Sequence, residues 1–297
     1  MRRAYLLVCA VAVAGAAAAA AWGLGPTEST AFLPSFAQIG TGPAGGTVWS
    51  GVIQNGTYPR SHRISLVYLP PDFSPHRRYP TLFVLHGLRG SPYSIANGLR
   101  FADVADSEIV AGRVRPFLAV MPPAGLTTRF HGEWTGVWER YVVADVLPWA
   151  EGDLPALPFR RDRAIAGLSA GGYGAADIGL RHPRLFGTIE AWSGSFTAPH
   201  DGSLRHASAA RLAANDPTHL AATEAALLRR LGTRFFLSCG TADPGNLIRS
   251  IEFAQRLSAL GLPHRTFFAL GGHNGRFWEA QLPQALRYAF PSLGSAV

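Results

Sequence analysis

The chain has 297 residues, of which 47% are hydrophobic and 15% are charged, and its formal net charge is +8. This length is enough for one large α/β domain with a full core, and no composition shift or linker divides the chain after residue 60. The basic side chains are all Arg and are scattered along the chain, which argues against a nucleic-acid partner. The charge still favours contact with an anionic membrane or envelope surface.

The first 22 residues have the pattern of a targeting segment. Met1-Arg2-Arg3 is basic, and an uninterrupted apolar run follows from Ala4 to Trp22. The small residues Ala17 to Ala21 suit cleavage by a signal peptidase, and the run is also close to the length that spans a bilayer. We therefore expect residues 1–22 to be a signal peptide or an N-terminal membrane anchor. The protein would then be exported, either secreted or held on the outer face of the cell membrane.

Residues 23–46 are rich in Gly, Pro, Ser and Thr and predict a flexible linker before a catalytic domain at 47–297. Cys9 lies inside the targeting segment. Its removal would leave Cys239 as the remaining thiol, so the mature chain would have no intrachain disulfide. Because Cys239 lies in an apolar strand pattern, we expect an inert core thiol.

The domain begins with two predicted antiparallel strands, 47–53 and 61–69, joined through Asn55-Gly56. Apolar strand patterns then alternate with helical patterns, and an Ala-rich segment at 198–230 interrupts the alternation as a helical insertion. This order predicts an α/β fold with a mainly parallel central sheet, helices on both faces and a leading antiparallel hairpin. The expected later strands are 79–85, 115–123, 164–166, 186–193, 234–240 and 265–270.

The most informative motif is Gly167-Leu168-Ser169-Ala170-Gly171, between an apolar strand pattern and an Ala-rich helical pattern. In this context G-x-S-x-G is typical of a nucleophile elbow. Glycines on both sides allow a tight turn, and the Ser hydroxyl then stands at a helix N-terminus, where negative charge is favoured. The motif predicts Ser169 as a nucleophile.

A Ser hydroxyl needs a base within hydrogen-bond reach, and the base needs a carboxylate to orient it. His273 follows the last predicted strand in a Gly-rich loop that suits the base. Asp243 follows the preceding predicted strand and is the expected acid, completing the chain order Ser, Asp, His. Glu252, one or two turns into the next helix, is the alternative acid. Asp243 would in that case serve as a turn or N-cap residue.

Two backbone N–H groups are expected to hold the oxyanion of acyl transfer, those of Ala170 and Leu88. Arg89 would lie near the mouth of the site, where it could bind an anionic group or a sugar hydroxyl or remain solvated. His131, in an aromatic loop, is a further candidate for substrate contact. Several aromatic residues could line a sugar or acyl groove or else pack in the core: Phe130, Trp134, Trp138, Phe196 and Trp278.

No metal or cofactor is predicted. The chain has no H-E-x-x-H motif and no clustered Cys and His ligands. The Gly-rich stretch Gly171-Gly172-Tyr173-Gly174 lacks the Lys of a phosphate-binding loop.

The combined motifs resemble the esterase D-like branch of the α/β-hydrolases over roughly residues 48–293. That branch includes feruloyl and acetylxylan esterases, S-formylglutathione hydrolase and the secreted mycolyltransferases of mycobacteria. The resemblance implies an α/β-hydrolase fold and a Ser-His-acid triad for residues 47–297. It rests on Leu85-His-Gly-Leu-Arg89, Trp138-Glu-Arg-Tyr141, Gly167 to Gly171, His182-Pro183, Cys239-Gly-Thr-Ala-Asp243 and Gly272-His273.

Gly87-Leu88-Arg89, Trp138-Glu139 and Trp278 to Leu282 are also similar to the mycolyltransferases, whose triad acid is a Glu within the helix. That similarity keeps Glu252 open, whereas Ala170-Gly171-Gly172 follows the plainer esterase pattern.

The leading hypothesis is an exported serine esterase that hydrolyses carboxylic esters through a Ser-His-Asp triad and an acyl-enzyme. The expected substrate is a small-molecule, lipid or polysaccharide ester. One alternative is an acyltransferase that moves the acyl group to a sugar hydroxyl. A second alternative is a non-catalytic envelope protein with a hydrolase fold. The acyl chain length and the oligomeric state stay open at this point.

Overall fold

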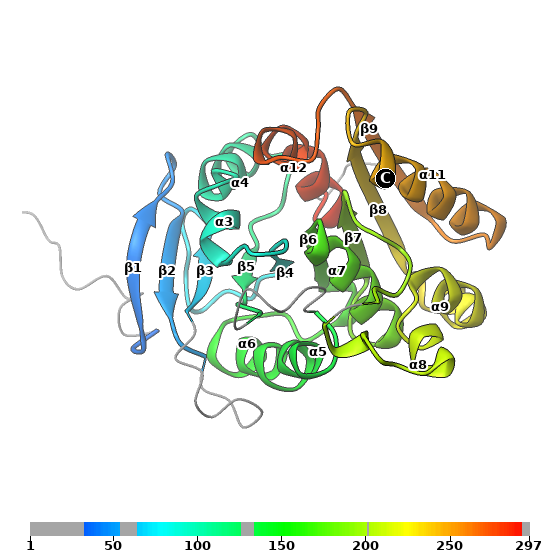
Figure 1. Cartoon of the computed structure of the whole chain (residues 1–297). Coiled ribbons are helices and arrows are strands. Elements are labelled where there is room, and N and C mark those ends of the chain that lie inside the picture. Colours follow the sequence, from blue (N-terminus) through cyan, green and yellow to red (C-terminus); the bar gives the residue numbers. More distant parts are fainter. Residues whose placement is uncertain (1–32, 54–63, 126–133, 201, 293–297) are drawn as a thin grey trace, which may run out of the picture.

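The computed structural model describes residues 33–53, 64–125, 134–200 and 202–292. Within them a nine-stranded sheet runs in the order β1-β2-β3-β5-β4-β6-β7-β8-β9 (Figure 1). The first three strands and β5 pair antiparallel, and all later neighbours pair in parallel. The strands are β1 (Phe36–Thr41), β2 (Thr47–Gly51), β3 (Ser65–Leu69), β4 (Thr81–Leu85), β5 (Leu118–Met121), β6 (Arg163–Leu168), β7 (Thr188–Trp192), β8 (Arg234–Gly240) and β9 (His264–Ala269). The predicted mainly parallel sheet with a leading antiparallel pair is therefore confirmed.

The central strands β3 to β7 are buried along their whole length because helices cover both faces of the sheet. One hydrophobic core lies under α3 (Pro92–Ala96), α4 (Phe101–Val110) and α12 (Gly275–Ala289). The other core lies under a second set of helical segments: α5 (Val137–Arg140), the π-helical segment η1 (Tyr141–Val146), α6 (Leu147–Asp153), α7 (Ala170–Arg181), α9 (Pro217–Thr223), α10 (Ala225–Leu231) and α11 (Pro244–Ala259). A 3₁₀ turn, η2 (Arg160–Asp162), precedes β6.

The segment between β7 and β8 is helical, as predicted for 198–230. It contains the 3₁₀ turn η3 (Gly202–Leu204) and α8 (Ala209–Ala213), followed by α9 and α10. The carboxylate of Asp216 caps α9 by accepting a hydrogen bond from the His219 N–H. Phe196, at the start of the segment, stacks on Phe253 of α11 with ring centroids 4.1 Å apart. The insertion is thereby packed against α7 and α11.

The flexible linker predicted for residues 23–46 is wrong from β1 onward. β1 pairs with β2, and the carboxylate of Asp106 on α4 accepts hydrogen bonds from the N–H groups of Ala44 and Gly46 and from the Tyr68 hydroxyl. A Cβ on Gly46 would lie 2.0 Å from that carboxylate. The small residues that suggest flexibility instead allow a close approach of backbone to a buried acid.

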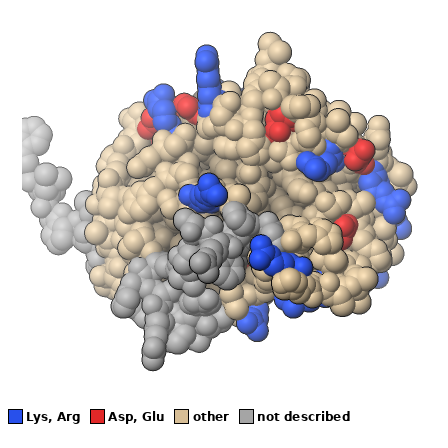
Figure 2. All heavy atoms as spheres, viewed as in Figure 1, with Lys and Arg blue, Asp and Glu red and all other residues tan. Residues whose placement is uncertain are grey.

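The predicted targeting segment, residues 1–22, and the Asn55-Gly56 turn lie outside the described residues. Among the residues that are described, no helix has both the length and the apolar character needed to cross a membrane. On the face shown in Figure 2, the Arg side chains are spread over the surface and do not gather into one patch.

Candidate active site

Ser169 lies at the tip of the turn between β6 and α7, with a backbone φ of +56°. A non-Gly residue in such a conformation costs about 1–3 kcal/mol, so the surroundings must hold it. A Cβ on Gly167 would lie 2.2 Å from the Gly171 carbonyl oxygen, and one on Gly171 would lie 2.1 Å from the Leu85 oxygen. The Ser169 N–H donates to the Trp192 carbonyl at 2.8 Å, which ties the turn to the end of β7.

His273 and Asp243 reach Ser169 from the loops that follow β9 and β8. His273 Nε2 lies 2.8 Å from Ser169 Oγ, and His273 Nδ1 lies 2.6 Å from Asp243 Oδ2. An ionised carboxylate only accepts hydrogen bonds, so Nδ1 carries the proton and Nε2 accepts from the Ser169 hydroxyl. The structure brings together the three residues that the sequence singled out.

Asp243 has surroundings that keep it ionised. Its partial burial acts to raise its pKa, but hydrogen bonds from the Asn246 amide and from His273 outweigh burial, and the pKa lies below its ordinary value. Asn246 Nδ2 donates to Asp243 Oδ1 at 3.1 Å and to Oδ2 at 3.0 Å. The Asp243 side chain is 11% exposed and that of His273 36%, so the imidazole borders solvent while the acid is covered.

Glu252 does not take the place of Asp243. It is exposed on α11, and within the described ranges no hydrogen bond or ion pair joins it to His273. Asp243 already accepts from His273 Nδ1, the only ring nitrogen that faces away from Ser169. The alternative acid is therefore not supported by the geometry.

The loop after β4 approaches Ser169 closely. A Cβ on Gly87 would lie 3.3 Å from the Ser169 Cβ, and the Gly90 N–H donates to the Gly87 carbonyl at 3.0 Å. The buried His86 ring braces this turn: its Nδ1 bonds the Gly87 carbonyl at 2.8 Å, and its Nε2 accepts from the Ala124 N–H at 3.0 Å. Both bonds are made at once by the neutral ring with its proton on Nδ1.

The two predicted oxyanion donors are Ala170, which follows Ser169 in the chain, and Leu88, which follows Gly87, the residue whose Cβ would lie 3.3 Å from the Ser169 Cβ. Ala170 is the first residue of α7, so its N–H has no partner inside the helix. In the described part of the chain, the Leu88 N–H likewise donates to no backbone carbonyl. An oxyanion hole requires two such unpaired backbone donors directed at one point near the Ser hydroxyl.

The residues predicted to contact substrate lie in different environments. Arg89 is exposed beside the Gly87–Gly90 turn, with a φ of +55°, and His131 and Phe130 lie outside the described residues. Trp134 is 1% exposed, and its indole N–H donates to the His86 carbonyl at 2.9 Å. The prediction that Trp134 contacts substrate is therefore wrong for this structure: the ring packs over Gly174 and supports the loop after β4. Trp138 and Phe196 are buried core residues as well.

Trp278 contacts the base and not open solvent. Its ring lies edge-on to the His273 ring with centroids 4.9 Å apart, and its indole N–H donates to Ser193 Oγ at 3.1 Å. The nearby Cys239 thiol lies 3.7 Å from Asp243 Oδ2. Burial raises the pKa of that thiol to about 11, so Cys239 stays protonated and is the inert core thiol expected.

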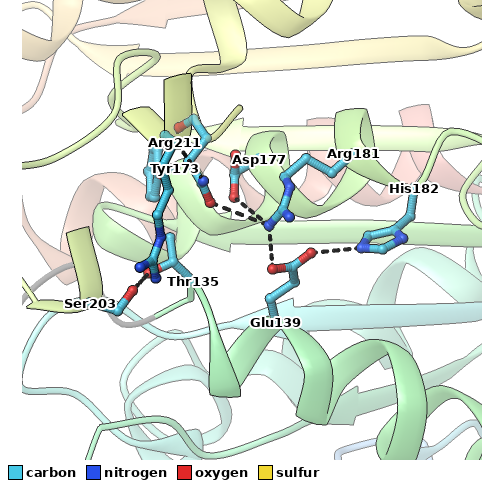
Figure 3. A network of polar contacts seen from close by, with 9 residues as sticks. Thr135, Glu139, Tyr173, Asp177, Arg181, His182, Ser203 and Arg211 are labelled. Atoms are coloured by element: carbon cyan, nitrogen blue, oxygen red, sulfur yellow. Dashed lines mark hydrogen bonds and ion pairs between the residues drawn. The ribbon is translucent and has the colours of Figure 1, made fainter. Parts of the chain in front are cut away.

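A second polar cluster fixes the helix that begins after Ser169 (Figure 3). Glu139 of α5 accepts from Arg181 at the end of α7 and pairs with His182 Nε2 at 2.8 Å. Burial acts to raise the pKa of Glu139, but these two partners lower it below its ordinary value. Arg181 also reaches Asn215 in the insertion at 3.3 Å. Trp138-Glu139 and His182-Pro183, read in the sequence as family motifs, thus include a structural clamp.

Asp177 lies inside this cluster and differs from Glu139. It is fully buried, and its nearest cation, Arg181, is 4.0 Å away. Neither of its carboxylate oxygens has a hydrogen-bond partner among the described residues. Burial raises its pKa to about 8, against the opposing charge of Arg181. Asp177 is therefore neutral at pH 7.

Across the described ranges, no group of three or more His, Cys, Asp or Glu side chains is placed to hold a metal ion.

Comparison with known proteins places these features in a family. Residues 58–289 match the family described as "Putative esterase". An esterase of Mycobacterium tuberculosis (strain H37Rv) is 28% identical over 251 residues, which cover 70% of this chain and 51% of that protein. The chain thus spans about half the length of this curated relative. An endo-1,4-beta-xylanase/feruloyl esterase of Xylanibacter ruminicola is 30% identical over 145 residues, which cover 46% of this chain and 20% of that protein.

Solved structures show the same architecture. A ferulic acid esterase superposes with a TM-score of 0.73 at 27% identity, covering 82% of this chain and 98% of that one. S-formylglutathione hydrolase from Staphylococcus aureus superposes with a TM-score of 0.65 at 19% identity, covering 86% and 98%. The second likeness shows the fold alone. Because the family match extends over residues 58–289 and a ferulic acid esterase superposes over 82% of the chain, the chain belongs to this esterase family of the α/β-hydrolase fold.

Proposed function

We propose that this chain is a serine esterase that hydrolyses carboxylic esters through an acyl-enzyme on Ser169. The observation that carries the proposal is the continuous contact from Ser169 Oγ through both ring nitrogens of His273 to the Asp243 carboxylate, with distances of 2.8 and 2.6 Å. Membership of an esterase family supports the reaction class.

In the proposed reaction, Ser169 Oγ attacks the ester carbonyl carbon while its proton passes to His273 Nε2. Asp243 stabilises the resulting imidazolium, and the Leu88 and Ala170 N–H groups donate to the oxyanion. The bond to the alcohol oxygen breaks as His273 returns the proton to it. Water then attacks the acyl-enzyme with His273 again as base, which releases the acid and restores Ser169.

A pocket of about 240 Å³ lies beside the Gly87–Gly90 turn, and because Ser169 and His273 are not among its lining residues, it is proposed to hold a part of the ester away from the reacting carbonyl. Its wall includes Gly90 from that turn, and most of the rest is apolar: Ile64, Pro92, Tyr93, Pro123 and Ala124. A pocket of this size suits a compact acyl or alcohol group better than a long chain. The likeness to a ferulic acid esterase supports esters of aromatic acids, free or on a polysaccharide, as the first substrates to test.

The test is hydrolysis of p-nitrophenyl esters from acetate to palmitate and of methyl ferulate, with Ser169→Ala and His273→Ala as controls. Each variant should lose about 10³-fold or more in turnover, because the nucleophile and its base act as a unit. Circular dichroism should show an intact fold. A loss of only a few-fold in a folded variant would refute the assignment of Ser169 and His273.

The same acyl-enzyme could pass its acyl group to a sugar hydroxyl in place of water. Product analysis with and without trehalose separates hydrolysis from transfer: free acid as the main product in both cases is the result expected here. If a fluorophosphonate probe failed to label Ser169 and no ester were cleaved, a non-catalytic envelope role would replace the esterase proposal.

We further propose that the protein is exported, because Met1-Arg2-Arg3 and the apolar run to Trp22 form a targeting pattern. Cell fractionation should find the full chain in the medium or the membrane fraction, and deletion of residues 2–22 should retain it in the cytosol. A full chain found in the cytosol with Met1 intact would contradict export.

A further inference from the structure

Asn246, the third residue of α11, contacts the acid of the proposed triad more extensively than any other amide side chain described. Its Nδ2 donates to both carboxylate oxygens of Asp243, at 3.1 and 3.0 Å, and lies 3.2 Å from His273 Nδ1. The amide oxygen cannot take this place, because it would face an ionised carboxylate with no proton between them. The contact chemistry therefore assigns the NH₂ group to Asp243.

We propose that Asn246 is a positioning residue for the proposed esterase reaction. Its amide holds the Asp243 carboxylate in place and limits how strongly that carboxylate stabilises a protonated His273. The inference rests on the proposed function for its catalytic meaning, but the electrostatic effect on His273 is measurable without any substrate.

The limit that Asn246 sets follows from competition for one carboxylate. The Asp243 Oδ2 atom accepts from His273 at 2.6 Å, from Asn246 at 3.0 Å and from the Cys239 thiol at 3.7 Å. A thiol is a weak donor, so the amide is the main neutral partner of this oxygen. Each hydrogen bond donated to the ionised Asp243 carboxylate stabilises the ionised form. It also reduces the negative charge that the carboxylate presents to its other partners. Without the amide, more of the negative charge would face His273.

The helix holds this amide in place. The side chains of Phe253, Ala254 and Leu257 bury the inner face of α11 in the core, and Asn246 is carried on the first turn of the same helix, three residues after Asp243. The amide is therefore fixed relative to β8, which delivers Asp243, and does not depend on the mobility of a surface loop.

Few other charged groups act on this pair. Around His273 the contacting side chains are Ser169, Asp243, Asn246 and Trp278. The charged residues on the adjacent turns of α11 and α12 are Arg249, Glu252 and Arg276. All three are exposed, and within the described residues none makes a hydrogen bond or ion pair with His273 or Asp243.

Two substitutions of similar size test the donor: Asn246→Leu removes it, and Asn246→Asp replaces it with a second, negatively charged acceptor. In each enzyme the acid limb of the kcat/KM–pH profile and the NMR titration of the His273 ring are measured. The midpoint should move to higher pH by about 0.5–1 unit in Asn246→Leu and further in Asn246→Asp, because more negative charge then faces the protonated His273 ring. The kcat should fall about tenfold in Asn246→Leu through looser positioning of Asp243.

Gln255→Leu makes the same amide-to-aliphatic change at an exposed position of the same helix and should leave both readouts unchanged. The His273 signal is assigned by its loss in His273→Gln. Equal midpoints in all three Asn246 enzymes, with Tm falling in the variants, would show a merely structural role and overturn the proposal. If Ser169→Ala still hydrolysed esters, the esterase mechanism would fail, and the NMR titration would still decide whether Asn246 controls His273.

Discussion

At Asp243, one side chain has to orient a base and remain ionised while mostly covered by protein. The Asn246 amide and His273 make this possible by donating to it, and together they lower its pKa despite burial. Glu252 stands exposed on α11, and no such donor reaches it from the residues that the structure describes. The surroundings of each carboxylate, and not its position in the chain, distinguish the proposed acid Asp243 from Glu252.

Substitution of each carboxylate by its amide tests this distinction. Asp243→Asn keeps the shape but presents an N–H or a weaker acceptor to His273 Nδ1, so kcat should fall by about 10³–10⁴-fold. Glu252→Gln should stay within about twofold of the parent, as expected for an exposed charge. Steady-state hydrolysis of a p-nitrophenyl ester measures both. A large loss in Glu252→Gln with activity retained in Asp243→Asn would reverse the assignment.

At the scale of elements, the leading strands are held by a buried acid. The loop between β1 and β2 donates two N–H groups to Asp106 of α4, whose side chain also accepts from the Tyr68 hydroxyl on β3. Three segments that are distant in the sequence thus meet at one carboxylate. The contact explains why a Gly-rich, Pro-containing stretch adopts one defined conformation.

A pair of glycine substitutions in this hairpin should separate the effect of close approach from that of composition. A Cβ on Gly46 would lie 2.0 Å from an Asp106 oxygen, whereas the nearest atom to a Cβ on Gly40 is 3.8 Å away. We expect Gly46→Ala to lower the free energy of unfolding by about 1–3 kcal/mol through broken bonds to Asp106. Gly40→Ala should change it by less than about 0.5 kcal/mol. Urea denaturation measures both, and equal effects would contradict this account.

For the molecule as a whole, the buried cluster of Figure 3 couples folding to pH. Asp177 has an ordinary pKa of 3.8 and a folded-state pKa of about 8, because burial disfavours its charge. The unfolded chain therefore loses this proton at lower pH than the folded chain. Across that window the unfolded state binds fewer protons, so the contribution of Asp177 to stability falls as pH rises.

Asp177→Asn supplies a permanently neutral side chain of the same shape. At pH 5 the unfolded parent is already ionised while the folded parent is neutral, so the variant should already have a small advantage in stability there. That advantage should be about 3 kcal/mol larger at pH 8 than at pH 5, a further rise of roughly 6–12 °C in Tm. Glu190, which is also fully buried with a raised pKa, contributes equally to both proteins and cancels in the difference. The same Tm change at both pH values would contradict a neutral Asp177.

Much of the sheet could be predicted because its signals are local. Continuous apolar runs mark strands covered on both faces: β4, β5, β7 and β8 lie within such predicted runs, and β6 contains the run predicted at 164–166 and extends beyond it. The limits of β1 could not be found in this way. Its order depends on Asp106, about 60 residues later in the chain, and a Gly-rich stretch carries no local sign of that contact.

The aromatic residues show the same limit at the site. An indole can line a groove or fill a core, and the sequence pattern is identical in both cases. Trp134 packs over Gly174 with its N–H on the His86 carbonyl, so it supports the proposed oxyanion loop from behind. Trp278 supports His273 through an edge contact.

The nucleophile and the base of the proposed triad follow from the sequence alone, because strand–turn–helix geometry around G-x-S-x-G and a Gly-flanked His after the last strand are properties of short segments. The choice between Asp243 and Glu252, the function of Asn246 and the neutral state of Asp177 follow only from the tertiary structure. Hydrogen-bond donors and burial act over a few ångströms in space, and they reach these carboxylates from residues that the chain order leaves far apart or on the far side of a helix turn.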